Sequence, residues 1–382
     1  MKTFSYFSIV TFLVLLFCVS CKESTVTTPT ETKEEIRIED YIYNADSVQT
    51  ACQIQNKTSL ISCISLYIIS ISKNKDRVLI FGGSPPGYKT GSWGGNVIYI
   101  LNIESNIHKF EPFDLTVLQS STSYQYFDVI KAHFCPYDND LLLAYIATNT
   151  SEGTNRSVSY DWYYYNLSTK KYTRLELDSP NHSYYRNNSN LIRWSSNSTP
   201  DNDQFIWENN SILSYPSGNI QPNATGRTLQ ENEKIYSISP DMKKVFTVIN
   251  NELFLNGSSV PNSKYIFRRG TPISWSDDSK RFLGVGIPQN PKAYLHVVYQ
   301  MKEGSTTDFS INNIIDLTRK HCNIQNPTFL LFAEELNSIF ISDSTIAVNL
   351  ALPSEKIPEI TNVNLNGDIL QRYTFSPINL KQ

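Results

Sequence analysis

The sequence predicts an all-β fold built from a repeated four-stranded unit, and three observations lead to this prediction. Aromatic residues make up 12% of the chain and include 23 tyrosines, which favours pleated, half-buried strands. Short apolar segments recur with turn residues between them, and no convincing amphipathic helix follows the first twenty residues. Several of these segments are separated by the same number of residues, which indicates an internal repeat.

The clearest copies of the repeat are residues 238–246 and 273–283. In each copy a small residue ends an apolar strand, Pro, Asp or Ser forms a turn, and basic residues precede a second strand. The small residue lies six positions before the first hydrophobe of the second strand in five pairs: Ser72 and Val78, Cys135 and Leu141, Ser239 and Val245, Ser276 and Phe282, and Ala333 and Ile339. A further copy at Trp194 and Ser195 carries a four-residue insertion before Phe205.

The spacing of the copies predicts a β-propeller. Successive copies begin between 37 residues apart (Ser239 to Ser276) and 63 residues apart (Ser72 to Cys135), and four short strands with their turns need about 40 residues. Radial repetition of such sheets is a propeller. We expect six blades, with seven as the alternative count, and we expect the two chain ends to meet in one blade. Two β-sandwiches with simple hairpins are the competing fold.

The Ser-Pro-Asp-x-Lys-Lys pattern of residues 239–244 resembles the repeat of TolB-type propellers, which also occurs in the propeller domains of some peptidases. Weaker matches to this pattern occur across residues 60–345. Only one copy has the full Ser-Pro-Asp, and the copies at Trp194 and Ala333 depart from the pattern most. The resemblance implies a propeller fold and leaves the function open.

The first twenty residues have the parts of a secretory signal. Lys2 gives a positive start, and residues 4–17 form an apolar run that is shorter than the ~20 residues of a membrane-spanning helix. Ser20 before Cys21 resembles the lipobox of bacterial lipoproteins, although Cys18 stands where Leu is usual. The resemblance implies cleavage before Cys21 and acylation of its thiol. An ordinary secretory signal is the alternative.

The segment after Cys21 is predicted to be a flexible tether. Residues 24–35 are polar, rich in Thr and nearly free of large hydrophobes, so they cannot bury enough surface to fold. We therefore divide the chain into a signal peptide (1–20), a lipidated cysteine with a linker (21–39) and a propeller (40–382). Lys22 and Glu23 resemble the charged signal of some surface-exposed Bacteroidetes-type lipoproteins. The predicted location is the bacterial cell envelope, at the outer membrane or cell surface.

Catalytic motifs and metal-ligand spacings are absent from the sequence. Thr90 stands where the first Gly of a Gly-x-Ser-x-Gly nucleophile motif is required. The histidines are scattered: His108, His133, His182, His296 and His321. We therefore expect no cofactor and no metal. The net charge is −3 and the basic residues are scattered, so the sequence shows no basic patch of the kind that binds nucleic acid.

The paired carboxylates have a structural explanation in the turns of the repeat. Asp277 with Asp278, and Asp138 with Asp140, are placed where short side chains accept backbone N–H bonds. Cysteines give no zinc pattern. Cys52 and Cys63 are close enough for a disulfide across a hairpin, a pairing that stays open, and Cys135 is expected in the core.

Two aromatic features are candidates for ligand contact. Residues 82–95 form a Gly-rich loop between two strong strands and contain Tyr88 and Trp93, whose rings can stack on a sugar or cover a peptide. An insertion that packs on the next blade explains the loop equally. Tyr163, Tyr164 and Tyr165 alternate faces along a strand, so at least one ring is expected to point outward.

The leading functional hypothesis is a non-catalytic binding or scaffold lipoprotein. Its lipid would hold it to a membrane, and its partners would be an envelope protein, a peptide or a glycan. A carbohydrate-active propeller hydrolase or lyase is the alternative, and a purely structural envelope component is a third reading. Carboxylates that converge in the channel would favour the enzyme, while Ser, Asn and apolar side chains there would favour the binder.

Overall fold

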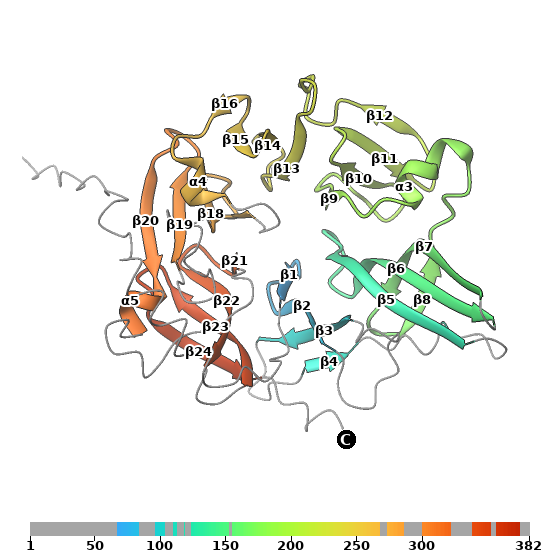
Figure 1. Ribbon diagram of the computed structural model, residues 1–382, viewed down its shortest axis with the longest axis horizontal. Helices are drawn as coiled ribbons and strands as arrows, with labels where there is room; N and C mark the ends of the chain where they lie inside the picture. Colours follow the sequence, from blue (N-terminus) through green and yellow to red (C-terminus); the bar gives the residue numbers. More distant parts are fainter. Residues whose placement is uncertain are drawn as a thin grey trace, which may run out of the picture. The chain divides into compact units, whose positions relative to one another are not determined.

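The computed structural model is a six-bladed β-propeller, as the repeat predicted (Figure 1). All described residues belong to the compact unit Ile38–Gln382. The structure describes residues 67–83, 96–103, 110–112, 118, 124–152, 155–267, 273–285, 300–321, 338–352 and 357–374.

Each blade is an antiparallel sheet of four strands in sequence order. Blade 1 comprises β1 (Tyr67–Ile71), β2 (Arg77–Gly83), β3 (Asn96–Asn102) and β4 (Phe110–Pro112). Blade 2 comprises β5 (Tyr124–Phe134), β6 (Leu141–Glu152), β7 (Asn155–Asn166) and β8 (Lys171–Arg174). Blade 3 comprises β9 (Leu191–Trp194), β10 (Asp203–Trp207), β11 (Ser211–Tyr215) and β12 (Ile220–Pro222).

The second half of the ring follows the same order. Blade 4 comprises β13 (Lys234–Ile238), β14 (Val245–Ile249), β15 (Glu252–Leu255) and β16 (Ser258–Ser259). Blade 5 comprises β17 (Ser274–Trp275), β18 (Arg281–Gly284), β19 (Gln300–Ser305) and β20 (Ile311–Asp316). Blade 6 comprises β21 (Ser338–Phe340), β22 (Thr345–Leu352), β23 (Ile357–Asn364) and β24 (Ile369–Thr374).

Helices in the described residues are short and lie in connections. They are η3 (Pro180–His182), α3 (Ser183–Arg186), α4 (Ser263–Ile266) and α5 (Leu317–His321). None of the described helices has the length and apolar character needed to cross a membrane.

The core lies between the blades, because successive side chains of a strand point to opposite faces of its sheet. In β6, Leu142 and Ala144 pack with residues of blade 1, whereas Leu143 and Tyr145 pack with residues of blade 3. First strands of neighbouring blades contact one another, namely β1 with β5 and β21, β9 with β5 and β13, and β17 with β21, so they line the inner wall of the ring. Both faces of a blade are thus covered.

This arrangement corrects the expectation that one ring of the tyrosine run points outward. The faces do alternate, because Tyr163 and Tyr165 pack with the cluster shared with blade 1, and Tyr164 packs with the cluster shared with blade 3. None of the three side chains is exposed. In a propeller both directions lead into an inter-blade core, and strand alternation alone cannot reveal this.

The expectation that the two chain ends share one blade is wrong for the described strands. Blade 6 takes all four of its strands from residues 338–374, so the first and last blades are neighbours. They close the ring by apolar packing of Tyr99 and Leu101 against Ile360 and Tyr373. The Tyr373 hydroxyl also donates to the Ile103 carbonyl at 3.4 Å.

Five of the six repeat copies mark the hairpin between the first and second strands of blades 1–5. The sixth was misplaced. Ile339 belongs to the first strand of blade 6, and the turn falls later, where the Ile341 N–H donates to the Thr345 carbonyl at 2.9 Å. Ala333 lies outside the described residues.

The core prediction around Trp275 is confirmed. Trp275 pairs with Phe282 across β17 and β18, and its ring packs against the cluster that contains Ile273 and Phe282. Its ring centroid lies 5.0 Å from that of Phe246 in blade 4. Cys135 is buried, as expected.

Candidate functional site

The turns between the first and second strands of the six blades gather at one end of the ring. We call this set the turn ring, and its members are residues 72–77, 135–141, 195–204, 239–244, 276–281 and 341–345. Contacts between these turns link neighbouring blades. Lys75 of blade 1 also pairs with Asp277 of blade 5, although blade 6 separates their blades in the ring.

The turn of blade 4 is built around Ser239, which is fully buried. Its hydroxyl donates to Asp241 Oδ1 at 2.5 Å and accepts the N–H of Lys244 at 2.9 Å. The Met242 N–H donates to the Ser239 carbonyl at 3.0 Å. Met242 has a φ of 62°, the left-handed conformation that lets the chain reverse here.

Blades 1 and 5 repeat this geometry, which explains the fixed offset in the sequence. Ser72 and Ser276 accept the N–H of the residue five positions later, Arg77 or Arg281, at 3.0 Å in both cases. The residue three positions after each serine has a positive φ, as Lys75 and Ser279 do. The next strand can begin only after this closed turn, hence six residues on.

The aspartates of these turns hold their own turn together. Asp278 accepts the Ser276 hydroxyl at 2.7 Å and the Lys280 N–H at 3.0 Å, and these bonds lower the pKa of its carboxyl. Burial opposes ionisation of Asp241, but its hydrogen bonds outweigh burial and lower the pKa of that carboxyl too. A proton-donating carboxylic acid needs the opposite shift at neutral pH.

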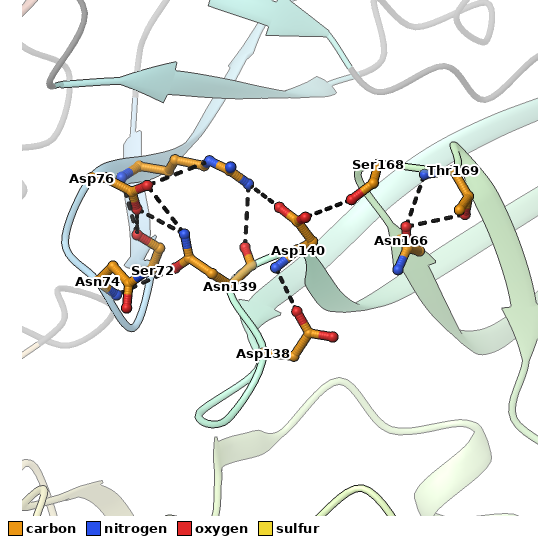
Figure 2. Close-up of polar contacts among 10 residues, drawn as sticks. Ser72, Asn74, Asp76, Asp138, Asn139, Asp140, Asn166, Ser168 and Thr169 are labelled. Carbon is orange, nitrogen blue, oxygen red and sulfur yellow. Dashed lines mark hydrogen bonds and ion pairs between the residues drawn. The ribbon is translucent and has the colours of Figure 1, made fainter.

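Figure 2 shows the junction between the turns of blades 1 and 2. Asn139 donates to both oxygens of Asp76, at 3.0 and 3.1 Å, and accepts the N–H of Asn74 at 3.2 Å. Asp140 accepts a hydrogen bond from the Ser168 hydroxyl and pairs with Arg77. The polar groups of the junction are therefore engaged with one another.

A basic side chain reaches forward from each of the first five blades to a main-chain carbonyl of the next blade. The donor and acceptor pairs are Lys73 to Tyr137 (3.5 Å), Lys131 to Leu191 (2.7 Å), Arg193 to Ser239 (2.9 Å), Lys244 to Ser279 (2.6 Å) and Arg281 to Asp343 (2.8 Å). We call these contacts the forward clamps. Charge-assisted hydrogen bonds are stronger than neutral ones, so the clamps fix each blade against its successor.

A second set of forward contacts comes from the inner strands, two residues before each turn. Ser70 accepts the Phe134 N–H at 3.4 Å, and Ser274 accepts the Phe340 N–H at 2.9 Å. Ser237 donates to the Ile273 carbonyl at 3.3 Å. Each contact crosses to the following blade.

His133 occupies the same position in blade 2 and is the exception. Its Nε2 is buried without a hydrogen-bond partner among the described residues. Burial, with the charges of Lys131 and Arg193, lowers the pKa of the His133 imidazole to about 3. The ring is therefore neutral at pH 7, and Lys131 supplies the forward contact of this blade.

A buried carboxylate of the turn ring, Asp203, joins blades 2 and 3. Asp203 Oδ1 accepts the Tyr137 hydroxyl at 2.9 Å and the Trp194 indole N–H at 2.8 Å, and Oδ2 accepts the Tyr164 hydroxyl. Burial raises the pKa of Asp203 despite these three donors. Sequence reasoning missed this group, because Asp203 lies at the end of the insertion in the third repeat.

The residues predicted to contact lipid or ligand lie outside the described part of the chain. These are Cys21, Tyr88 and Trp93, and Cys52 and Cys63 lie outside it as well. Of the histidines, His182 and His321 contact single carbonyls, those of Gly218 at 2.9 Å and Gly367 at 2.7 Å. The described residues contain no cluster of three His, Cys, Asp or Glu side chains able to hold a metal.

Asp128 is the sole carboxylate on the described inner strands. In the turn ring, Asp76, Asp140, Asp241 and Asp278 accept bonds from their own turns or from the adjacent blade. The turn ring is thus a cross-linked frame, whose polar groups support the loops and strands around it.

Comparison with solved structures finds proteins that resemble this chain at low identity. An oligogalacturonate lyase from Vibrio parahaemolyticus aligns over 78% of this chain and 90% of that chain, with 10% identity and a TM-score of 0.38. The β-propeller domain of the Trilobed protease from Pyrococcus furiosus aligns over 82% and 84%, with 10% identity and a TM-score of 0.31. The Cps50 (Swd1) propeller domain of Myceliophteria thermophila aligns over 83% and 100%, with 7% identity and a TM-score of 0.34. Similarity at this level concerns the fold alone. No protein-family model and no curated protein sequence matches the chain.

Proposed function

We propose that the protein is a non-catalytic binding protein of the bacterial cell envelope. Acyl chains on Cys21 attach it to a membrane, and the propeller presents its loops and edges to a protein, peptide or glycan. The observation that carries this proposal is the engagement of the turn-ring carboxylates. Asp76, Asp241 and Asp278 accept bonds from their own turn or the next blade. Acid–base chemistry at these groups would break the turns that hold them.

The cross-linked ring also favours binding for a physical reason. A rigid frame lowers the entropy lost when a partner is bound, because the contact residues are already positioned. The forward clamps supply such a frame. Gly83 and Asn96 are paired between β2 and β3, so the two ends of the Tyr88 and Trp93 loop are held side by side.

Replacement of residues 84–95 by Asn-Gly tests the loop. The pairing of Gly83 with Asn96 suits a two-residue turn, so the thermal midpoint should stay close to that of the parent. Binding to the ligand found on a glycan array or a peptide array should fall. The double variant Tyr88→Ala, Trp93→Ala keeps the loop length, and its binding should fall by the same factor. Undiminished binding by both variants would show that the loop is not part of the binding site.

Cys21→Ala tests the anchor. In cells given an alkyne analogue of palmitate, the parent protein should carry label and fractionate with membranes, and Cys21→Ala should do neither. Cys18→Ala is the matched control and should keep both properties. Equal labelling of the parent and Cys21→Ala would end the proposal of a lipid anchor at this residue.

A further inference from the structure

The outer edge of blade 2 is open along half of its third strand. β7 has 12 residues, whereas its outer neighbour β8 has 4. β6 pairs with β7 along its whole length, from Asn155 to Asn166, but β8 pairs only from Tyr163 onward. Leu175 adds one bond, from its N–H to the Trp162 carbonyl at 2.8 Å. Before Trp162, β7 has no outer neighbour among the described strands.

The alternation of an antiparallel ladder fixes which main-chain groups face this open edge. The Trp162 carbonyl points outward, since it accepts a bond from the β8 side. Groups two and four residues earlier point the same way, so the N–H and C=O of Tyr160 and Val158 face outward. Ser157 and Ser159 point inward to β6, with which they are paired.

The side chains at this edge form an apolar stripe. Val158 and Tyr160 share one face of β7 and are 49% and 38% exposed. The Tyr160 ring is stacked on Tyr145, with centroids 5.7 Å apart and planes 14° from parallel. Tyr145 is buried and holds the exposed ring in place.

Protection of the edge is weak in the described residues. Edge strands usually carry Lys, Pro or a bulge that hinders pairing with another chain. The open stretch, residues 155–161, reads Asn-Arg-Ser-Val-Ser-Tyr-Asp and contains neither Lys nor Pro. Its acidic charge, on Asp161, is already paired with Arg174 at 2.9 Å and Arg186 at 3.0 Å. Its basic residue, Arg156, precedes the apolar stripe.

We propose that this edge of β7 is a docking site for an extended segment of a partner protein, which pairs with Val158 and Tyr160 as an added strand. Outward donors and acceptors recur every second residue, about 7 Å apart, which matches an extended polypeptide. Alternate apolar side chains of the segment would lie on Val158 and Tyr160. The inference rests on the proposed binding function and names the class of partner.

The probe for this site is a phage-displayed library of random dodecapeptides, selected on the full chain. The variant Val158→Pro removes an outward N–H and leaves the bonds between β6 and β7 in place. Val158→Thr is the matched control, because it keeps the N–H and the β-branched shape. A selected peptide should bind Val158→Pro at least about tenfold more weakly than the parent, and Val158→Thr within about threefold of it. Unchanged thermal midpoints would show that both variants are folded.

Amide hydrogen exchange locates the bound peptide independently of the variants. Bound peptide should slow exchange at Val158 and Tyr160 and leave Ser157 and Ser159 unchanged, since the latter already bond to β6. Protection elsewhere, or full affinity in Val158→Pro, would overturn the proposal that this edge is the docking site and would leave the proposed binding function intact. A dimer of the parent that protects the same two amides would also overturn it, because a second copy would then hold the edge. Cleavage of the peptides would instead overturn the proposed function.

Discussion

Replacement of Ser239 by alanine tests the turn geometry that underlies the repeat. The Ser239 hydroxyl makes two hydrogen bonds, to Asp241 and from the Lys244 N–H, and the residue is fully buried. Without the hydroxyl, the Lys244 N–H has no acceptor, which costs about 1–3 kcal/mol. The Asp241 carboxylate loses the hydroxyl donor but still accepts the Lys243 N–H. We therefore expect the free energy of unfolding to fall by about 2–3 kcal/mol.

Urea unfolding followed by tryptophan fluorescence measures this change. Ser258→Ala is the control, because Ser258 is exposed on β16, and it should change the free energy by no more than about 0.5 kcal/mol. Ser276→Ala in blade 5 should cost as much as Ser239→Ala, because its hydroxyl has the same two partners in its own turn. A Ser239→Ala protein as stable as the Ser258→Ala control would refute the account of the turn.

The two serine variants should not be additive. The turns of blades 4 and 5 touch, since the Asp241 N–H donates to Ser279 Oγ at 3.1 Å and Lys244 donates to the Ser279 carbonyl. Residues that share partners couple by about 0.5 kcal/mol or more. Strict additivity in the double variant would mean that the turns act independently.

Three further predictions concern His133, the buried Asp203 and the half-buried Trp275. Because the folded pKa of His133 lies near 3, below its unfolded value of about 6.5, the unfolded chain binds the proton first and stability falls as pH drops through that window. The loss should reach ~2 kcal/mol at pH 5 in urea titrations, and a His133→Leu protein that showed the same loss would contradict this. Trp275→Ala should lower the free energy of unfolding by about 3–5 kcal/mol. Trp275→Phe should lose mainly the hydrogen bond from the indole N–H to Ser237 Oγ, at 2.7 Å. An unchanged melting temperature in the alanine variant would mean that the ring is exposed. Asp203→Asn should cost about 2 kcal/mol, because its amide N–H₂ would face hydroxyl and indole donors; calorimetry that shows no loss would mean that this carboxylate is dispensable.

The repeat was readable from the sequence because one hydrogen-bonded turn imposes it. Ser239 and Ser276 set the offset through bonds that need a serine hydroxyl and a short acidic side chain at fixed positions. Where the turn is shorter, as between Ile341 and Thr345, the offset fails and the copy was misplaced. The pattern therefore identified blades 1, 4 and 5, which use the serine turn. It also identified blade 2, where Cys135 replaces the serine, and blade 3, where the turn is longer, and it failed for blade 6.

Contacts between blades were beyond the reach of the sequence. The role of Lys131 as a forward clamp depends on a carbonyl 60 positions away, at Leu191, and no local pattern encodes it. The open edge at Tyr160 arises because β8 has 4 residues and β7 has 12, and no local pattern marks which part of a long strand its neighbour covers. The ligand contacts expected of Tyr88 and Trp93 stay predictions, as does the lipid anchor.

The claim that the chain binds without catalysis is tested most directly by product analysis. The parent protein and the double variant Asp241→Asn, Asp278→Asn are incubated with defined envelope polysaccharides and peptides. Retention on immobilised protein is measured together with new chain ends, which are detected by mass spectrometry. The account predicts retention by the parent, no new ends with either protein, and a lowered melting temperature in the double variant. New reducing ends or new peptide termini that form with the parent and vanish with the double variant would contradict it.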